Sequence, residues 1–262
     1  VLSPDINESE ENFTISEENL IRFGLLHIKN VGHNVVEGIG KDRKERGSFK
    51  SIFDFVSRIE SRNLNKKSLE SLITAGCFDN FEERNKLLSN VEKLLEWNRD
   101  NQRMKIQGQK TIYGGGENFH PNSNFVLTET KPATKTEKLN WEKELLGLYV
   151  TSHPLEDFKT IFAKKVWPIA KIPQDVSQRI IKIGGIISNI KKIITRTGRP
   201  MLFLHLEDLT DKIEVVAFPG IVERNPTAFQ ENKIVLISGR VDNKRGAPKI
   251  ICEDIEEIIS TS

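Results

Sequence analysis

A change of hydrophobic period near residue 180 is the feature that most constrains the fold. Before it, apolar residues recur at helical spacing, whereas after it β-branched residues gather in short runs typical of strands. The runs are IKIGGIISNI, MLFLHLED, KIEVVAF, KIVLISGRV and PKIICEDIEEI, and a non-strand stretch, PGIVERNPTAFQEN, separates the third from the fourth. Five strands with an interruption at that place predict a five-stranded β-barrel of the OB type.

The first hundred residues predict short helices instead. Apolar side chains recur at helical spacing at Ile28, Val31, Val35 and Ile39. Gly47 lies where a C-terminal cap belongs, and Ser51 with Asp54 predicts a capping box. Asn65 is expected to cap the helix KKSLESLITA, which Gly76 ends. These features predict a compact run of helices joined by short loops.

Between these two regions the composition changes to Asn, Gln, Gly, Thr and Lys, which predicts an exposed linker. A short helix is then expected to begin near Trp141 and to end before Pro154. The fold class is therefore expected to be α+β with several domains. The expected parts are the end of a preceding domain (1–19), an all-α region (20–98), a linker (99–138), a helical connector (139–178) and the barrel (179–262).

The segment HIKNVGHNVVEGIGKDRKERG, residues 27–47, resembles a helix-hairpin-helix element. Gly32 is expected to permit the tight hairpin, and free N–H groups at the start of the next helix can hold a phosphate oxygen. Such contacts hold the DNA backbone without reading sequence. A helical corner with a solvated basic face is the alternative interpretation. The residues expected to bind DNA are Lys29, Asn30, Val31, Gly32, His33, Asn34, Lys41, Arg43 and Lys44, with Arg46 as a further available charge.

A second hairpin is expected at SRNLN, between SIFDFVSRIE and KKSLESLITAGCFD. It lacks a glycine like that of the first hairpin, so its own contact with DNA is open. Packing that completes the first hairpin is the favoured role.

Several blocks resemble, in order, the alpha subunit of bacterial DNA polymerase III. The blocks are PDIN, IRFGLLHIKNVG, SLITAGCFD and EKELLGLYVTSHPL, followed by the OB-like strands. The resemblance implies the end of the fingers in residues 1–19, a tandem helix-hairpin-helix, a clamp-binding peptide and an OB domain for single-stranded template. The family's catalytic aspartates lie upstream in the palm, so no catalytic residue is expected here, although the parent protein would be a DNA-directed DNA polymerase. The start at Val1 fits a fragment of a longer protein.

The same resemblance points to a clamp-binding peptide at Gln109, Ile112 and Tyr113. A peptide with Gln, two further residues, an aliphatic and an aromatic can bury its apolar pair in a groove of a ring-shaped sliding clamp. The family usually shows Leu and Phe at the last two positions, so Ile112 and Tyr113 depart from it while keeping similar shapes. A plain linker is the alternative.

Basic loops are expected to flank the oligonucleotide face of the barrel. Phe203 and Phe218 are the candidates for stacking on bases, and at least one of them is expected to pack inside the barrel. Weak, salt-sensitive binding to single strands follows, with loop charges that serve only solubility as the alternative. The residues expected to bind single-stranded DNA are Lys191, Lys192, Arg196, Arg199, Phe203, Lys244 and Arg245.

Particular residues argue against a phosphate-loop, metal or cofactor site. Asp42 replaces the Ser or Thr that a phosphate loop needs, and Asp208 and Asp211 are expected to form a turn rather than a metal site. The histidines show no metal-binding spacing, so no metal or cofactor is expected. The two cysteines lie far apart without a CxxC motif, which fits a protein of the reducing cytoplasm. No apolar run is long enough to span a membrane, so no membrane partner is expected.

These features predict a processivity segment of a replicative polymerase. Its expected partners are duplex DNA, single-stranded DNA, the sliding clamp and further replicase subunits. A stand-alone helix-hairpin-helix and OB protein of DNA repair is one alternative. A scaffold that contacts only proteins is another, and it would have no affinity for DNA.

Overall fold

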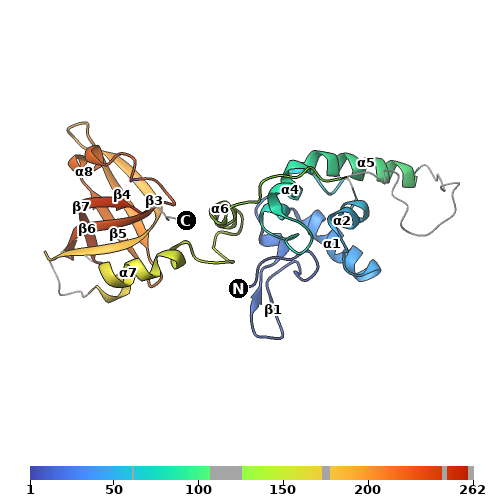
Figure 1. Cartoon of the computed structure of the whole chain (residues 1–262), viewed down its shortest axis with the longest axis horizontal. Coiled ribbons are helices and arrows are strands. Elements are labelled where there is room, and N and C mark those ends of the chain that lie inside the picture. Colours follow the sequence, from blue (N-terminus) through green and yellow to red (C-terminus); the bar gives the residue numbers. More distant parts are fainter. Residues whose placement is uncertain (61, 107–125, 173–177, 244–246, 259–262) are drawn as a thin grey trace. The chain divides into compact units, whose positions relative to one another are not determined.

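The computed structural model describes residues 1–60, 62–106, 126–172, 178–243 and 247–258. The chain divides into two compact units, Val1–His153 and Pro154–Ser262, which are coloured blue to green and yellow to red in Figure 1. The first unit is helical and the second contains a closed barrel. The predicted α+β fold class is confirmed.

The first unit combines a small β-ribbon with six α-helices and one 3-10 helix in its described part. Its elements are β1 (Thr14–Ile15), β2 (Ile21–Arg22), η1 (Leu25–His27), α1 (His33–Arg46), α2 (Ile52–Arg58), α3 (Lys66–Thr74), α4 (Arg84–Ser89), α5 (Val91–Ile106) and α6 (Lys135–Leu146). Aromatic rings lie at its centre, where Phe55 packs edge-on against Phe49 at 5.1 Å and against Phe78 at 4.9 Å. All three rings are at most 2% exposed, so the core is formed by α2 and the segments on either side of it.

Local capping explains several helix boundaries. The Ser51 side chain accepts a hydrogen bond from the Asp54 N–H, as expected, but Asp54 in turn accepts from the Lys50 N–H rather than from Ser51. The Asp54 side chain therefore satisfies the N–H group one residue before the N-cap. Asn65 caps α3 as predicted, and Gly47 ends α1 with φ of 77°.

The start of α1 differs from the expectation. Ile28 and Val31 are buried but lie in the turn before the helix, which begins only at His33. Their side chains face the same core as Val35 and Ile39, so a turn reproduces the apolar spacing of a helix.

The expected linker is largely folded at both of its flanks. Helix α5 continues to Ile106, and Leu127 is buried in the core of the first unit. The Asn90 side chain exchanges two hydrogen bonds of 3.1 Å with the backbone of Thr128, one through each group of its amide. Both flanks of residues 107–125 thus belong to the first unit.

Helix α6 also begins earlier than expected near Trp141. Thr134 and Glu137 form a capping box, and the helix runs from Lys135 to a left-handed Gly147 at its C-cap. The polar sequence KTEK conceals this start, because its only helical signal is the capping pair itself.

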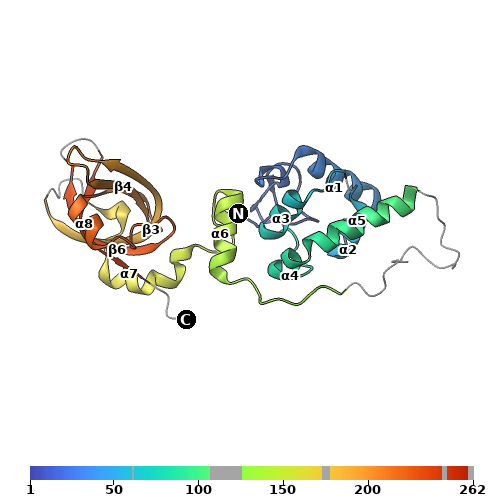
Figure 2. The ribbon, with the colours of Figure 1, turned by 90° about the horizontal axis from the view of Figure 1, so that it is seen from above.

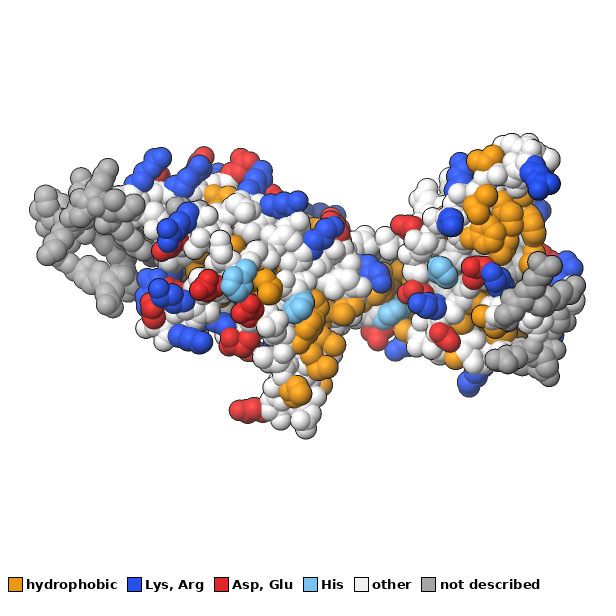
Figure 3. All heavy atoms as spheres, turned by 180° about the vertical axis from the view of Figure 1, so that it is seen from behind, with side chains coloured by type: hydrophobic (Ala, Val, Ile, Leu, Met, Phe, Trp, Pro, Cys, Tyr) orange, Lys and Arg blue, Asp and Glu red, His pale blue; other side chains and the backbone are white. Residues whose placement is uncertain are grey.

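A short β-ribbon projects from the first unit. Apolar side chains gather over it (Figure 3), and Ile15 is 75% exposed. Phe13 stacks edge-on against the buried Phe23 at 4.8 Å, which holds the base of the ribbon.

The second unit is a five-stranded barrel with short helices before and within it. Its elements are η2 (Pro154–Phe158), α7 (Lys159–Lys165), η3 (Ile169–Lys171), β3 (Ile180–Ile194), β4 (Pro200–Glu207), β5 (Lys212–Ala217), α8 (Pro219–Arg224), β6 (Ile234–Asp242) and β7 (Lys249–Glu257). The strands close in the order β3-β4-β5-β7-β6 around their own core (Figure 2). The predicted OB barrel, with its interruption between the third and fourth strands, is confirmed.

Alternation along β4 sets the inner and outer faces of the barrel. Leu202, Leu204 and Leu206 are buried inside, and they pair with alternate residues of β5. Gly185 of β3 lies against the backbone of Glu207 in β4, where a Cβ would be only 2.4 Å from the Glu207 carbonyl oxygen. The missing side chain therefore allows the two strands to approach closely beside the bulge of β3. None of the described helices is long and apolar enough to span a bilayer.

Candidate nucleic-acid interface

The first hairpin leaves the N-terminus of α1 uncapped. Gly32 is its N-cap, and the N–H groups of Val35 and Val36 donate to the Gly32 carbonyl at 3.1 and 3.3 Å. Within the described part of the chain, the N–H groups of His33 and Asn34 donate to no protein atom. A 14-residue helix therefore presents free donors at its positive end.

The hairpin turns at Asn30 rather than at Gly32. Asn30 has φ of 68°, in the left-handed region, whereas Gly32 has an ordinary φ of −85°. The expectation that Gly32 permits the turn is therefore wrong, because Asn tolerates that region better than most residues. A Cβ at Gly32 would meet nothing within 4 Å, so the glycine leaves open space beside α1.

Two neighbouring helices hold the hairpin in place. The Asn30 side-chain amide donates to Ser71 Oγ in α3 at 3.2 Å, and the Lys29 N–H donates to the Leu145 carbonyl in α6 at 3.0 Å. Val31 and Ile28 are buried beneath it. The free donors of α1 are therefore carried on a fixed support.

The predicted cations of this site have different surroundings. Lys41 and Lys44 are exposed, whereas the Arg43 side chain is 10% exposed and bonds to the Ile6 carbonyl and to Glu10. Arg43 thus holds the N-terminal segment in place. Lys29 Nζ lies 3.7 Å from Glu144.

An acidic segment lies beside the same helix end. Glu11 Oε1 is 3.1 Å from His33 Nδ1, and Glu10 is 3.3 Å from Arg43. The Glu10 and Glu11 carbonyls accept the N–H groups of Leu25 and Leu26, so the segment is fixed. Sequence reasoning missed these counter-charges, since residues 10 and 11 are distant from α1 in sequence.

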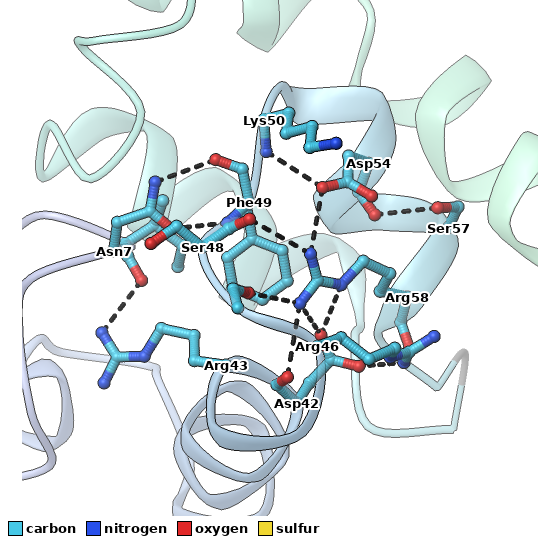
Figure 4. Close-up of polar contacts among 12 residues, drawn as sticks. Asn7, Asp42, Arg43, Arg46, Ser48, Phe49, Lys50, Asp54, Ser57 and Arg58 are labelled. Atoms are coloured by element: carbon cyan, nitrogen blue, oxygen red, sulfur yellow. Dashed lines mark hydrogen bonds and ion pairs between the residues drawn. The ribbon is translucent and has the colours of Figure 1, made fainter. Parts of the chain in front are cut away.

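A buried ionic cluster occupies the C-terminal half of α1 (Figure 4). Asp42 is 6% exposed, and its Oδ2 accepts from Arg58 Nε at 2.5 Å. Arg46 bonds the other carboxylate oxygen, and the Arg58 guanidinium lies 4.3 Å from the centre of the Phe49 ring. Burial and the nearby Arg58 lower the pKa of the Arg46 guanidinium. Arg46 therefore belongs to a structural cluster that joins α1 to α2.

The second hairpin closes its own helix end. Asn65 Oδ1 accepts the Ser68 N–H at 2.9 Å, and Ser68 Oγ accepts the Asn65 N–H at 3.2 Å. Lys66 next to it pairs with Glu92 at 2.7 Å. The start of α3 thus offers fewer free donors than the start of α1.

A groove of about 640 Å³ runs between α1 and the turn that follows α2. Asn34 and Lys41 line one side, and Arg62 and Asn63 line the other. The groove also contains carboxylates, among them Glu37. It brings the start of α1 next to the second hairpin, which the sequence order alone does not reveal.

The candidate stacking residue of the barrel wall is Phe203, on the outer face of β4. Phe203 pairs with Lys191 on β3 and with Val216 on β5, and both Phe203 and Val216 alternate with inward-facing neighbours. Phe203 is half-buried and Phe218 is 46% exposed. The expectation that one of these two rings packs inside the barrel is wrong, because Phe203 lies between the inward-facing Leu202 and Leu204, and Phe218 precedes α8.

The end of β3, with Lys191 and Lys192, and the loop that follows it are basic, but the two arginines of the loop differ. Lys191, Lys192 and Arg196 are exposed. Arg199 forms a two-pronged pair with Glu223 of α8, at 2.9 and 2.5 Å. That pair raises the pKa of Arg199 and lowers the pKa of Glu223.

Several predicted residues lie outside the described part of the chain. They are Gln109, Ile112 and Tyr113 of the clamp peptide, and Lys244 and Arg245 of the fourth barrel loop.

The predicted turn at Asp208 is confirmed. Asp208 Oδ1 accepts the N–H groups of Thr210 and Asp211 at 2.6 and 2.9 Å, and Oδ2 accepts the Ile169 N–H at 2.8 Å. No group of three or more potential metal ligands was found among the described residues.

Comparisons with known proteins cover both units. Residues 1–88 match a family described as a helix-hairpin-helix motif, and residues 181–258 match an OB-fold nucleic acid binding domain. These matches coincide with the α1 hairpin and with the closed barrel.

Curated relatives match nearly the whole chain. DNA polymerase III subunit alpha of Saccharopolyspora erythraea is 34% identical over 97% of this chain and 22% of the relative. The subunits of Borreliella burgdorferi and Bacillus subtilis are 33% and 32% identical over 98% of this chain. The chain spans about a fifth of the length of these relatives. The predicted resemblance to the alpha subunit of bacterial DNA polymerase III is therefore confirmed, with this chain similar to one segment of it.

Proposed function

We propose that this chain is a DNA-binding and clamp-tethering segment of a bacterial replicative DNA polymerase that supports processive replication. The observation that carries the proposal is the uncapped start of α1, which lies in the part that matches the helix-hairpin-helix motif. Similarity to polymerase relatives across both units favours this over a stand-alone repair protein.

Duplex DNA is the proposed partner of the first hairpin. The free N–H groups of His33 and Asn34 can donate to a phosphate oxygen, and the helix dipole favours negative charge there. Gly32 has no side chain to obstruct the phosphate, while the exposed Lys41 and Lys44 add positive charge. Contacts to phosphates alone make the binding independent of sequence and sensitive to salt.

Single-stranded template is the proposed partner of the barrel. Phe203 and Phe218 can stack on bases, and Lys191, Lys192 and Arg196 can neutralise phosphates. The pair between Arg199 and Glu223 must weaken before Arg199 contributes fully. Lys244 and Arg245 remain part of this proposal.

The sliding clamp is the proposed partner of Gln109, Ile112 and Tyr113. The two flanks of this peptide are anchored in the first unit, through α5 on one side and Leu127 on the other. That anchoring supports tethering of the clamp to the unit that holds the duplex. Clamp pull-down with all three residues changed to Ala tests the assignment, and undiminished binding would refute it.

Catalysis is proposed to reside elsewhere in the parent protein. The chain matches about a fifth of relatives named as DNA polymerase III subunit alpha. We therefore place nucleotidyl transfer and its cofactors in the remaining four fifths of the parent protein, together with most contacts to further replicase subunits. The parent protein is proposed to act in the cytoplasm.

Substitution of Gly32 tests the duplex site. Gly32→Asp puts a good N-cap at the start of α1 and a negative charge where the phosphate would lie. We expect unchanged or slightly raised thermal stability together with duplex affinity lowered about tenfold or more, since a charged hydrogen bond contributes about 1.5 kcal/mol or more.

Gly40→Ala is the matched control, because a Cβ there also meets nothing within 4 Å. Fluorescence anisotropy with a labelled duplex measures both variants. Duplex binding by Gly32→Asp at the wild-type level would refute the proposed site.

A further inference from the structure

The barrel unit exposes a tryptophan on a part of its wall that the proposed function does not use. Trp167 is 39% exposed, whereas Trp97 in the first unit is 6% exposed. The Trp167 backbone N–H donates to the Lys182 carbonyl at 2.8 Å. Lys182 lies in the half of β3 that pairs with β6, so this surface is distinct from the outer face of β4 and β5.

The segment that carries this tryptophan is fixed to the barrel. Ile169 is buried in the barrel core, and its N–H donates to Asp208 Oδ2 at 2.8 Å. With Trp167 bonded to β3, the backbone is held on both sides of Pro168. A side chain on a fixed support loses less conformational freedom when it binds a ligand.

A cation lies beside the ring. The Arg179 guanidinium lies 5.7 Å from the centre of the Trp167 ring, within the range of a cation–π contact. Lys182 of β3, whose carbonyl accepts the Trp167 backbone N–H, is also exposed. Ile180 between them is 61% exposed and lies opposite the exposed Arg240, which pairs with Glu253.

We propose that Trp167 and Arg179 form a second binding site of the barrel unit, which stacks a base of single-stranded nucleic acid and contacts its phosphate. A flat aromatic surface accepts any base, and nearby cations neutralise the backbone. A protein partner could pack against the ring but would not in general require a cation beside it. Single-stranded nucleic acid has both a base to stack on Trp167 and a phosphate to pair with Arg179, so it is the better candidate.

The site rests on the proposed binding of single strands by the barrel and extends it. Long strand β3 contributes to both surfaces, through Lys182 at one end and Lys191 at the other. A strand that contacts both surfaces would have a longer footprint than one bound only at β4 and β5.

Binding of a labelled oligothymidylate to the full chain tests the site. We expect Trp167→Ala to lower affinity about fivefold or more, as for loss of a stacking partner, and Trp167→Phe to retain most of it. Tryptophan emission of the wild type should be quenched by the oligonucleotide, and this quenching should largely disappear in Trp167→Phe.

Matched variants separate this site from other effects. Leu209→Ala removes another exposed apolar side chain of the same unit, 45% exposed, and should leave binding unchanged. Arg179→Ala keeps the ring while removing the charge, and should weaken binding with a steeper loss at low salt. Thermal unfolding of each variant confirms that the barrel is intact.

Each outcome decides between the two surfaces. If Phe203→Ala weakens binding while Trp167→Ala and Arg179→Ala bind normally, the second site is refuted and the proposed function of the barrel stands. If the wild type itself binds no single strand, the proposed function of the barrel is refuted together with the second site. Unquenched tryptophan emission on saturation with oligonucleotide would refute stacking on Trp167.

Discussion

At the scale of single residues, the acidic segment beside α1 is expected to limit the strength of the proposed duplex site. Glu11 lies 3.1 Å from His33, close to the free donors of the helix. Its carboxylate repels an approaching phosphate and partly neutralises the positive end of α1. Weak contacts fit the proposed role in a polymerase that moves along its template.

Glu11→Gln should therefore tighten duplex binding about two- to fivefold at low salt, with less effect at high salt because the charge is screened. Anisotropy titrations at two salt concentrations measure this. Glu17→Gln, which removes an exposed charge from the same terminal region, is the control. Equal gains for both variants would show that only net charge matters.

Arg84 is expected to be the most sensitive charged residue of the first unit. Its guanidinium is 1% exposed and donates to Asp79 and to the Thr74 carbonyl, and it lies 4.0 Å from the buried Glu142. Arg84→Ala should cost about 3 to 5 kcal/mol, because the buried Glu142 loses a counter-charge and the Thr74 carbonyl loses its donor. The exposed Arg103→Ala should cost almost nothing. Urea unfolding measures both, and a loss below about 1 kcal/mol for Arg84→Ala would contradict the buried network.

The two thiols should be unreactive in the folded chain. Burial raises the pKa of Cys252 to about 12, and burial with nearby Asp5 raises the pKa of Cys77. Both stay protonated in the fold, so their contribution to stability is full below the unfolded thiol pKa and is lost as pH rises from there toward the folded value. Titration with a thiol reagent at pH 8 should detect neither cysteine before denaturant is added, and rapid reaction of the native chain would contradict this.

At the scale of elements, helix ends marked by capping residues were predicted most reliably from the sequence, and buried turns least reliably. Gly47, Ser51 and Asn65 mark helix ends that the structure confirms. Val31 misled because a turn that packs against a core has the same apolar spacing as a helix. Period alone therefore locates buried positions more reliably than it locates the first residue of a helix.

The capping box of α6 was overlooked and can be tested directly. Thr134→Ala should destabilise the first unit by about 1 kcal/mol, because the Glu137 N–H loses its acceptor. Thr136→Ala, at an exposed position inside the same helix, should be neutral or slightly stabilising. Chemical denaturation compares the two, and equal effects would exclude a capping role for Thr134.

At the scale of the whole molecule, the sequence identified both kinds of domain and misjudged what joins them. The barrel was predictable because its strands alternate locally and need no knowledge of distant residues. The exchange of hydrogen bonds between Asn90 and Thr128 joins residues far apart in the sequence, and no local pattern reports it. A polar, glycine-rich stretch shows that a segment lacks its own core, but it does not show where its flanks dock.

The division after His153 makes a prediction about truncation. A chain ended at residue 138, the expected edge of the linker, loses Leu145 and Leu146 from the first core and the bond from the Lys29 N–H to the Leu145 carbonyl. A chain ended at residue 153 keeps all of these. The shorter chain should therefore unfold at a lower urea concentration and bind duplex more weakly, because the hairpin loses its support from α6. Equal stability and equal duplex affinity of the two chains would show that α6 is not part of the unit that holds the DNA.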